Sequence, residues 1–154
     1  MRLKIFVLLS IAALLCTPAM AGTRIDDPAK FVASIYATTV DKKPEPEDIY
    51  TPRLAALFAL DRKEAGGEVG RMDFDFWSNA QDSQLSDVKV RAVPLENANR
   101  EVVIATFRNL GKKQEIHFYF EKTTEGWKLD DARSLAGESW TLSLILKYGW
   151  DGKP

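Results

Sequence analysis

The sequence predicts an α+β fold: two N-terminal helices packed on a curved, cone-like antiparallel sheet of four or more strands, then a short C-terminal helix. Two observations lead to this prediction. Two proline-initiated amphipathic segments precede residue 67, and three consecutive segments between residues 100 and 132 alternate between apolar and polar residues. A period of two residues is that of a strand with one buried face. The helices supply the second layer that such a sheet needs.

The predicted sheet is centred on residues 114–123, where Ile116, Phe118 and Phe120 alternate with residues that face the other way. The neighbouring segments follow the same period, and the turns at 109–112 contain the Asn and Gly that tight reversals favour. The earlier segment 86–93 alternates in the same way. Pro94 ends it, because a proline has no N–H to pair within a central strand. The predicted strands are 86–93, 101–110, 114–123 and 126–131.

The first helix is predicted to start at Asp27 and Pro28, because an acidic N-cap followed by proline suits a helix start. Its apolar stripe consists of Phe31, Val32, Ile35 and Tyr36. Residues 41–48 contain two prolines among charged residues and read as a surface connection within one domain.

The second helix repeats this arrangement at Thr51 and Pro52, and Gly66 and Gly67 are expected to end it. Its apolar residues are Leu54, Leu57 and Phe58, and the stripe could extend to Leu60. Residues 138–150 fit both a helical and a strand period. We interpret them as a short helix capped by Ser139 and ended by Gly149.

The first 21 residues have the pattern of a secretory signal peptide. Two basic residues precede an apolar run at 5–15 that is too short to span a bilayer, and Ala19, Met20 and Ala21 form a small-residue cleavage site. Cleavage after Ala21 would leave a periplasmic or secreted protein without a stable membrane anchor. A lipoprotein at Cys16 is the alternative, but bulky Leu15 replaces the small residue that normally precedes an acylated cysteine.

Removal of 21 of the 154 residues leaves 133 residues, 22–154, that are expected to form one domain. This segment has no cysteine, which excludes disulfides, a thiol nucleophile and a cysteine metal site. Loss of Arg2 and Lys4 changes the formal net charge from -1 to -3. A mildly acidic chain without a basic stripe argues against nucleic acid as a partner.

Several short aromatic features recur along residues 22–154: Phe31 and Tyr36 in the first helix, and the segments 73–76, 79–82, 126–131 and 139–142. Together they resemble an exported bacterial group, domain-of-unknown-function family 3828, within the nuclear-transport-factor-2-like (cone-fold) superfamily. The resemblance covers most of residues 22–154. It implies a cone-shaped fold and an exported location, and the superfamily includes enzymes, ligand binders and interaction modules.

The segment 72–82 combines aromatic residues with carboxylates and amides, and it allows two interpretations. In the first, its aromatic residues anchor it to the core while polar groups line the mouth of a small-molecule site. In the second, the polar side chains close turns and satisfy backbone N–H groups while the aromatic residues fill the core. The candidate ligand-binding residues are Asp75, Trp77, Gln81 and Asp82, with Tyr36 from the first helix.

Catalysis and metal binding find little support in the sequence. The only histidine, His117, is expected to face away from the core. Asp75 could act as a base of raised pKa, as in the isomerases and hydratases of the cone-fold superfamily, but it has no identifiable partner. The spacing of the acidic residues between 73 and 82 does not match a calcium loop. No catalytic residue, metal or cofactor is therefore assigned.

The outward face of the predicted sheet is a candidate interaction surface, and its candidate residues are Arg91, His117 and Tyr119. The mixed-charge face is expected to contain Lys89, Arg91, His117, Tyr119, Lys128 and Asp130, with the aromatic residue near its centre. An ordinary solvated sheet face shows the same alternation, so this alternative stays open. We expect an exported, non-catalytic binding module that holds a small ligand. The alternatives are a protein-interaction or inhibitor protein, including a homodimer, that uses the sheet face, and thirdly an isomerase or hydratase.

Overall fold

The computed structural model describes residues 22–38 and 47–150. The expected signal peptide at 1–21 and residues 41–46 of the expected connection lie outside the described residues, as do the last four residues.

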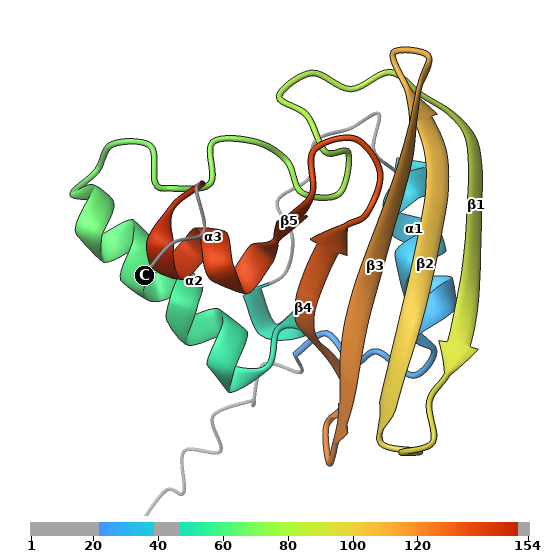
Figure 1. The fold of residues 1–154 in the computed structure, drawn as a ribbon. Helices are drawn as coiled ribbons and strands as arrows, with labels where there is room; N and C mark the ends of the chain where they lie inside the picture. The colour runs from blue at the N-terminus through green and yellow to red at the C-terminus, as the bar shows by residue number, and fades with distance from the viewer. Residues whose placement is uncertain (1–21, 39–46, 151–154) are drawn as a thin grey trace, which may run out of the picture.

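The described chain confirms the predicted fold class: two N-terminal helices, an antiparallel sheet and a short C-terminal helix. The strand order in the sheet follows the order in the sequence, β1-β2-β3-β4-β5. Helix α1 lies against one face of the sheet behind β1 and β2, while α2 and α3 lie together beside β4 (Figure 1). None of the described helices is both long and apolar enough to cross a membrane. The elements are α1 (Pro28–Thr38), the 3₁₀ turn η2 (Glu47–Ile49), α2 (Pro52–Ala65), β1 (Leu85–Pro94), β2 (Arg100–Asn109), β3 (Lys112–Thr123), β4 (Gly126–Ser134), β5 (Trp140–Thr141) and α3 (Leu142–Tyr148).

Both predicted helix starts are confirmed by their capping bonds. The Asp27 carboxylate accepts a hydrogen bond from the Lys30 backbone N–H at 3.0 Å. The Thr51 hydroxyl accepts one from the Leu54 N–H at 3.3 Å. Gly66 ends α2 with a φ of 62°, a left-handed conformation that favours glycine.

The core lies on the face of the sheet that the period-two pattern predicted. Ile116, Phe118 and Phe120 are all buried, and α1 adds Val32 and Tyr36 to the same cluster. Full burial of a side chain of this size contributes roughly 1.5–3 kcal/mol each. Packing of α1 on β1 and β2 therefore holds the other face of these strands toward solvent.

The C-terminal segment 138–150, which fits both a strand period and a helical period, forms a short strand followed by a helix. Trp140 and Thr141 form β5, and the helix begins only at Leu142. The expected cap at Ser139 is wrong, because Ser139 lies before β5. Instead the Asp131 carboxylate accepts bonds from the Ser143 N–H at 3.0 Å and from the Ser143 hydroxyl at 2.6 Å.

Candidate functional site

The outer sheet face, the face of β1 to β4 opposite α1, gathers the three residues of the predicted interaction surface. Residues paired across antiparallel strands share a face. Arg91 and His117 belong to one cross-strand row, and Tyr119 belongs to the next. The two rows are Arg91–Ile104–His117–Arg133 and Val93–Val102–Tyr119–Asp131.

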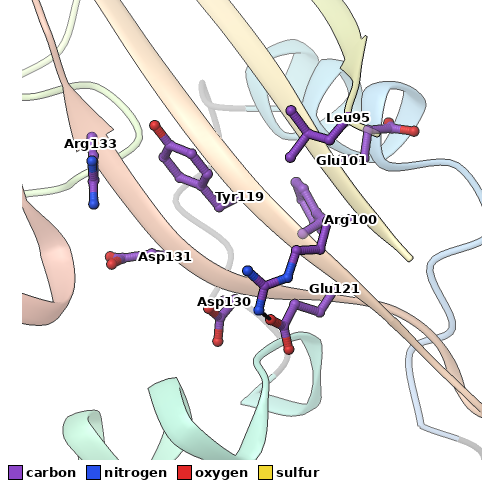
Figure 2. A pocket seen from close by; sticks show the side chains of 9 residues that line it. Leu95, Arg100, Glu101, Tyr119, Glu121, Asp130, Asp131 and Arg133 are labelled. Atoms are coloured by element: carbon purple, nitrogen blue, oxygen red, sulfur yellow. Dashed lines mark hydrogen bonds and ion pairs between the residues drawn. The ribbon is translucent and has the colours of Figure 1, made fainter. Parts of the chain in front are cut away.

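A depression of about 310 Å³ lies on this face over β2, β3 and β4, beside the loop that follows β1. Figure 2 shows Tyr119, Asp131 and Arg133 on one side of it and Arg100 with Glu121 on the other. Its walls combine an aromatic ring, an exposed aliphatic side chain and charges of both signs. The lining residues are Leu95, Arg100, Glu101, Tyr119, Phe120, Glu121, Asp130, Asp131 and Arg133.

A β-bulge in β4 shapes this depression. Tyr119 pairs with Asp131, but the next residue, Phe120, pairs with Leu129, so Asp130 is an extra residue without a partner in β3. The bulge turns Asp130 toward the start of α2. There the Thr51 hydroxyl donates to its carboxylate at 2.8 Å.

The carboxylate of Asp130 also forms a two-point contact with Arg53. The Nε of Arg53 donates to Oδ1 at 3.1 Å, and Nη2 donates to Oδ2 at 2.9 Å. Partial burial opposes ionisation of Asp130, but the bonds from Arg53 and Thr51 outweigh it, so the pKa of Asp130 lies below its ordinary value. Asp130 therefore stays ionised and links α2 to β4.

Asp131, the cross-strand partner of Tyr119, is already engaged. Asp131 accepts two bonds from Ser143, as described above, and its carboxylate lies 3.9 Å from Arg53. Burial, and secondarily the charge of Asp27, raises the pKa of Glu101 at the far side of the depression. An engaged carboxylate is a poor general base, so Asp130 and Asp131 are poor candidates for catalysis.

Arg133 and Tyr119 form the exposed aromatic and cationic centre of the outer sheet face. The guanidinium carbon of Arg133 lies 5.3 Å from the centroid of the Tyr119 ring. Cation–π contacts of this kind contribute about 0.5–1 kcal/mol at exposed sites. The contact restrains the position of the Arg133 side chain and does not neutralise its positive charge.

His117 lies in the same row as Arg133 but has an acidic partner of its own. Its Nε2 lies 2.7 Å from Glu115 Oε1, and 16 % of its side chain is exposed. It does not line the depression beside Tyr119. Among the described residues, no group of three or more His, Cys, Asp or Glu side chains is placed to hold a metal ion.

The structure brings three of the predicted ligand residues, Tyr36, Asp75 and Trp77, together beneath the sheet. Asp75 accepts bonds from the Trp77 N–H at 3.0 Å and the Ser78 hydroxyl at 2.7 Å, which closes the turn. Trp77 is buried and stacks on Phe118 with ring centroids 4.6 Å apart. The Tyr36 hydroxyl donates to the Trp77 carbonyl at 2.7 Å, and burial, followed by the charge of Asp75, raises the pKa of Tyr36.

The other two predicted ligand residues lie elsewhere. Gln81 is exposed and lines a second depression of about 610 Å³, together with Phe74 and Trp150. Asp82 is also exposed, and its backbone carbonyl accepts a bond from the Asn109 amide at 3.4 Å. The five candidates therefore do not surround one cavity, although a role in ligand binding stays a prediction for each.

Two asparagines hold the 72–82 segment on the sheet, although the sequence interpretation gave them only roles in turns. Asn79 has a φ of 55°, accepts a bond from the Trp140 indole N–H at 2.6 Å, and donates to Gln114 at 2.9 Å. Asn109 donates to the Ser78 carbonyl at 3.2 Å. In the sequence, an asparagine in a turn-rich segment indicates a turn. It does not identify the distant residue to which the asparagine side chain bonds.

No family model, curated protein or solved structure matches this chain.

Proposed function

We propose that this protein is an exported, non-catalytic binding module that recognises a protein partner on its outer sheet face, around Tyr119 and Arg133. The main support is that this solvent-facing sheet surface retains aliphatic residues beside an ordered aromatic–cation pair. Export rests on the signal-peptide pattern at 1–21, and membership in the cone-fold group rests on the resemblance given above.

The aliphatic residues in question are Val102 and Ile104. Each is 6 % exposed, yet neither belongs to the core cluster between α1 and the sheet. The outer face of β1 to β3 is open toward the viewer in Figure 1, with α1 on the opposite side. Longer side chains of the outer face therefore shield Val102 and Ile104, and a partner could displace these side chains and bury the aliphatic surface.

Chemistry at the depression supports binding over catalysis. Asp130 and Asp131 hold α2 and α3 in place, and Glu121 is paired with Arg100. A general base needs a lone pair free for the substrate. The same reasoning disfavours an isomerase or hydratase that uses Asp75, because both its carboxylate oxygens already accept hydrogen bonds.

A small ligand held between α1 and the sheet is the second candidate function. One observation favours it: within the described part of the chain, the indole Nε1 of Trp77 is a buried donor without a hydrogen-bond partner. Buried donors are nearly always satisfied, so an acceptor from a bound molecule would account for this one. Such a ligand would have to separate Trp77 from part of the aromatic packing around it.

Site-specific photo-cross-linking in the producing cell tests the proposed function. A photoreactive residue is placed at Thr106 on the outer sheet face and, as a matched control, at exposed Ala56 on α2. We expect a discrete adduct from Thr106 that disappears when Tyr119→Lys is added, and none from Ala56. Equal adducts at both positions, or an adduct indifferent to Tyr119→Lys in a folded protein, would contradict the proposal.

A further inference from the structure

We infer that the partner of the outer sheet face is an acidic polypeptide segment, bound in an extended conformation across β1 to β4. This inference rests on the function proposed above and names the chemistry of the partner. It follows from the distribution of ion pairs on the face. The charged groups there without an oppositely charged partner among the described residues are all basic: Lys89, Arg91, Lys113 and Arg133.

The acidic groups of the same face are all engaged. Each lies within ion-pair distance of a basic group: Asp87 with Arg108 at 3.3 Å, Glu115 with His117 at 2.7 Å, Glu121 with Arg100 at 2.5 Å, and Asp131 with Arg53 at 3.9 Å. The remaining positive charge makes this face attractive to anions, although the chain as a whole has a formal net charge of -1. Such complementarity speeds association and selects partners.

The spacing of the free cations favours an extended segment. Arg91 on β1 and Arg133 on β4 end the same cross-strand row, three inter-strand steps or about 14 Å apart. An extended chain advances about 3.4 Å per residue, so acidic side chains four residues apart match this distance. The residue midway between them would face the same way and lie between Ile104 and His117, where an apolar side chain can contact Ile104.

Polyanions such as nucleic acid or an anionic membrane fit this face less well. Glu115, Glu121 and Asp131 lie between the basic groups and would repel a continuous phosphate array. A peptide can place its carboxylates over Arg91 and Arg133 and avoid these positions. The partly exposed ring of Tyr119 in the adjacent row also offers the aromatic contact that protein interfaces favour.

Binding of a defined peptide to the protein lacking residues 1–21 tests this inference. The probe is a fluorescent peptide that contains the unit Glu-Ser-Leu-Ser-Glu, and the control peptide replaces both glutamates with lysine. We expect the acidic peptide alone to bind, with affinity that falls as salt rises. Arg91→Glu and Arg133→Glu should each weaken binding about tenfold or more, whereas Lys63→Glu on exposed α2 should leave it unchanged.

Several outcomes would overturn the inference. They are equal binding of the lysine peptide, indifference to Arg91→Glu and Arg133→Glu, or displacement of the peptide by duplex DNA or anionic vesicles at equal charge concentration. Failure of the acidic peptide to bind, with the Thr106 adduct still dependent on Tyr119, refutes the acidic partner but leaves the proposed function standing. A dimer in light scattering that Arg133→Glu dissociates would instead identify a second copy of this chain. Loss of both peptide binding and the adduct contradicts the two together.

Discussion

The guanidinium of Arg133 on β4 lies over the ring of Tyr119 on β3, with 5.3 Å between the guanidinium carbon and the ring centroid. The contact places a cation, which has no carboxylate partner among the described residues, at a depression where Asp130, Asp131 and Glu121 are already paired. Its contribution to folding is small, so we expect its main effect to be on the proposed recognition of a partner. The outer sheet face can therefore be altered at Tyr119 and Arg133 without unfolding the protein.

Tyr119→Lys and Arg133→Glu are each expected to change the free energy of unfolding by less than about 1 kcal/mol, because both side chains lie outside the core cluster. Urea unfolding followed by circular dichroism measures this. Phe118→Ala, on the opposite face of β3, serves as the contrast and should cost about 3–5 kcal/mol. Comparable losses for Tyr119→Lys and Phe118→Ala would show that the outer face is structural.

Arg53→Gln is expected to destabilise the protein by about 1 kcal/mol at neutral pH, because it removes the two-point contact with Asp130. Arg53 is half-exposed, which keeps the effect modest. The pKa of Asp130 is lower in the folded protein than its ordinary value of 3.8. The contact therefore stabilises fully above that value, and its contribution is lost as pH falls through the folded pKa.

Unfolding of wild type and Arg53→Gln should consequently differ at neutral pH and converge at about pH 2. Lys147→Gln on α3, which lacks an ion pair among the described residues, is the control and should shift stability equally at both pH values. A constant difference between wild type and Arg53→Gln across this range would rule out the Asp130 contact as its source.

Asn109→Ala is expected to cost about 1–3 kcal/mol, since it leaves the buried Ser78 carbonyl and the Gln84 N–H without their partner. Thermal and urea unfolding provide the measurement. Gln81→Ala, an exposed amide in the segment that Asn109 holds, should be nearly neutral. If both variants were neutral, the segment would be held by its aromatic residues alone.

Trp77→Phe separates the two candidate functions. It keeps an aromatic ring against Phe118 but removes the unpartnered Nε1–H, so the free energy of unfolding should fall by only about 1 kcal/mol. Ligand binding is then measured in wild type and Trp77→Phe as the increase in melting temperature across a set of metabolites. Loss of a ligand-induced increase in melting temperature in Trp77→Phe would favour the small-ligand function, and an unchanged increase would exclude the indole N–H from ligand binding.

Local patterns in the sequence were enough to predict the two N-terminal helices and the four long strands. The alternation of Ile116, Phe118 and Phe120 gave the buried face of β3, and Thr51 with Pro52 gave the start of α2. In both cases the deciding interactions lie within a few residues or follow from the period alone. Such signals do not depend on knowledge of the tertiary partners.

The candidate site depended on contacts that sequence periodicity does not encode. The bulge at Asp130 breaks the alternation of β4, and the side chain of Asp130 accepts a hydrogen bond from Thr51, 79 residues away. The same holds for Asn79 and Trp140, which are 61 residues apart. The sequence left Trp77 open as a core anchor or as a ligand-binding residue, and periodicity could not show that its ring stacks on Phe118.

Hydroxyl-radical footprinting of Tyr119 tests most directly whether the outer sheet face is the binding surface. Oxidation of Tyr119 is measured in the isolated protein and in the complex recovered through the Thr106 adduct, with partly exposed Tyr148 on α3 as the internal reference. We predict that Tyr119 is protected in the complex while Tyr148 is oxidised as before. Equal oxidation of Tyr119 in the two samples would contradict a binding surface at this face.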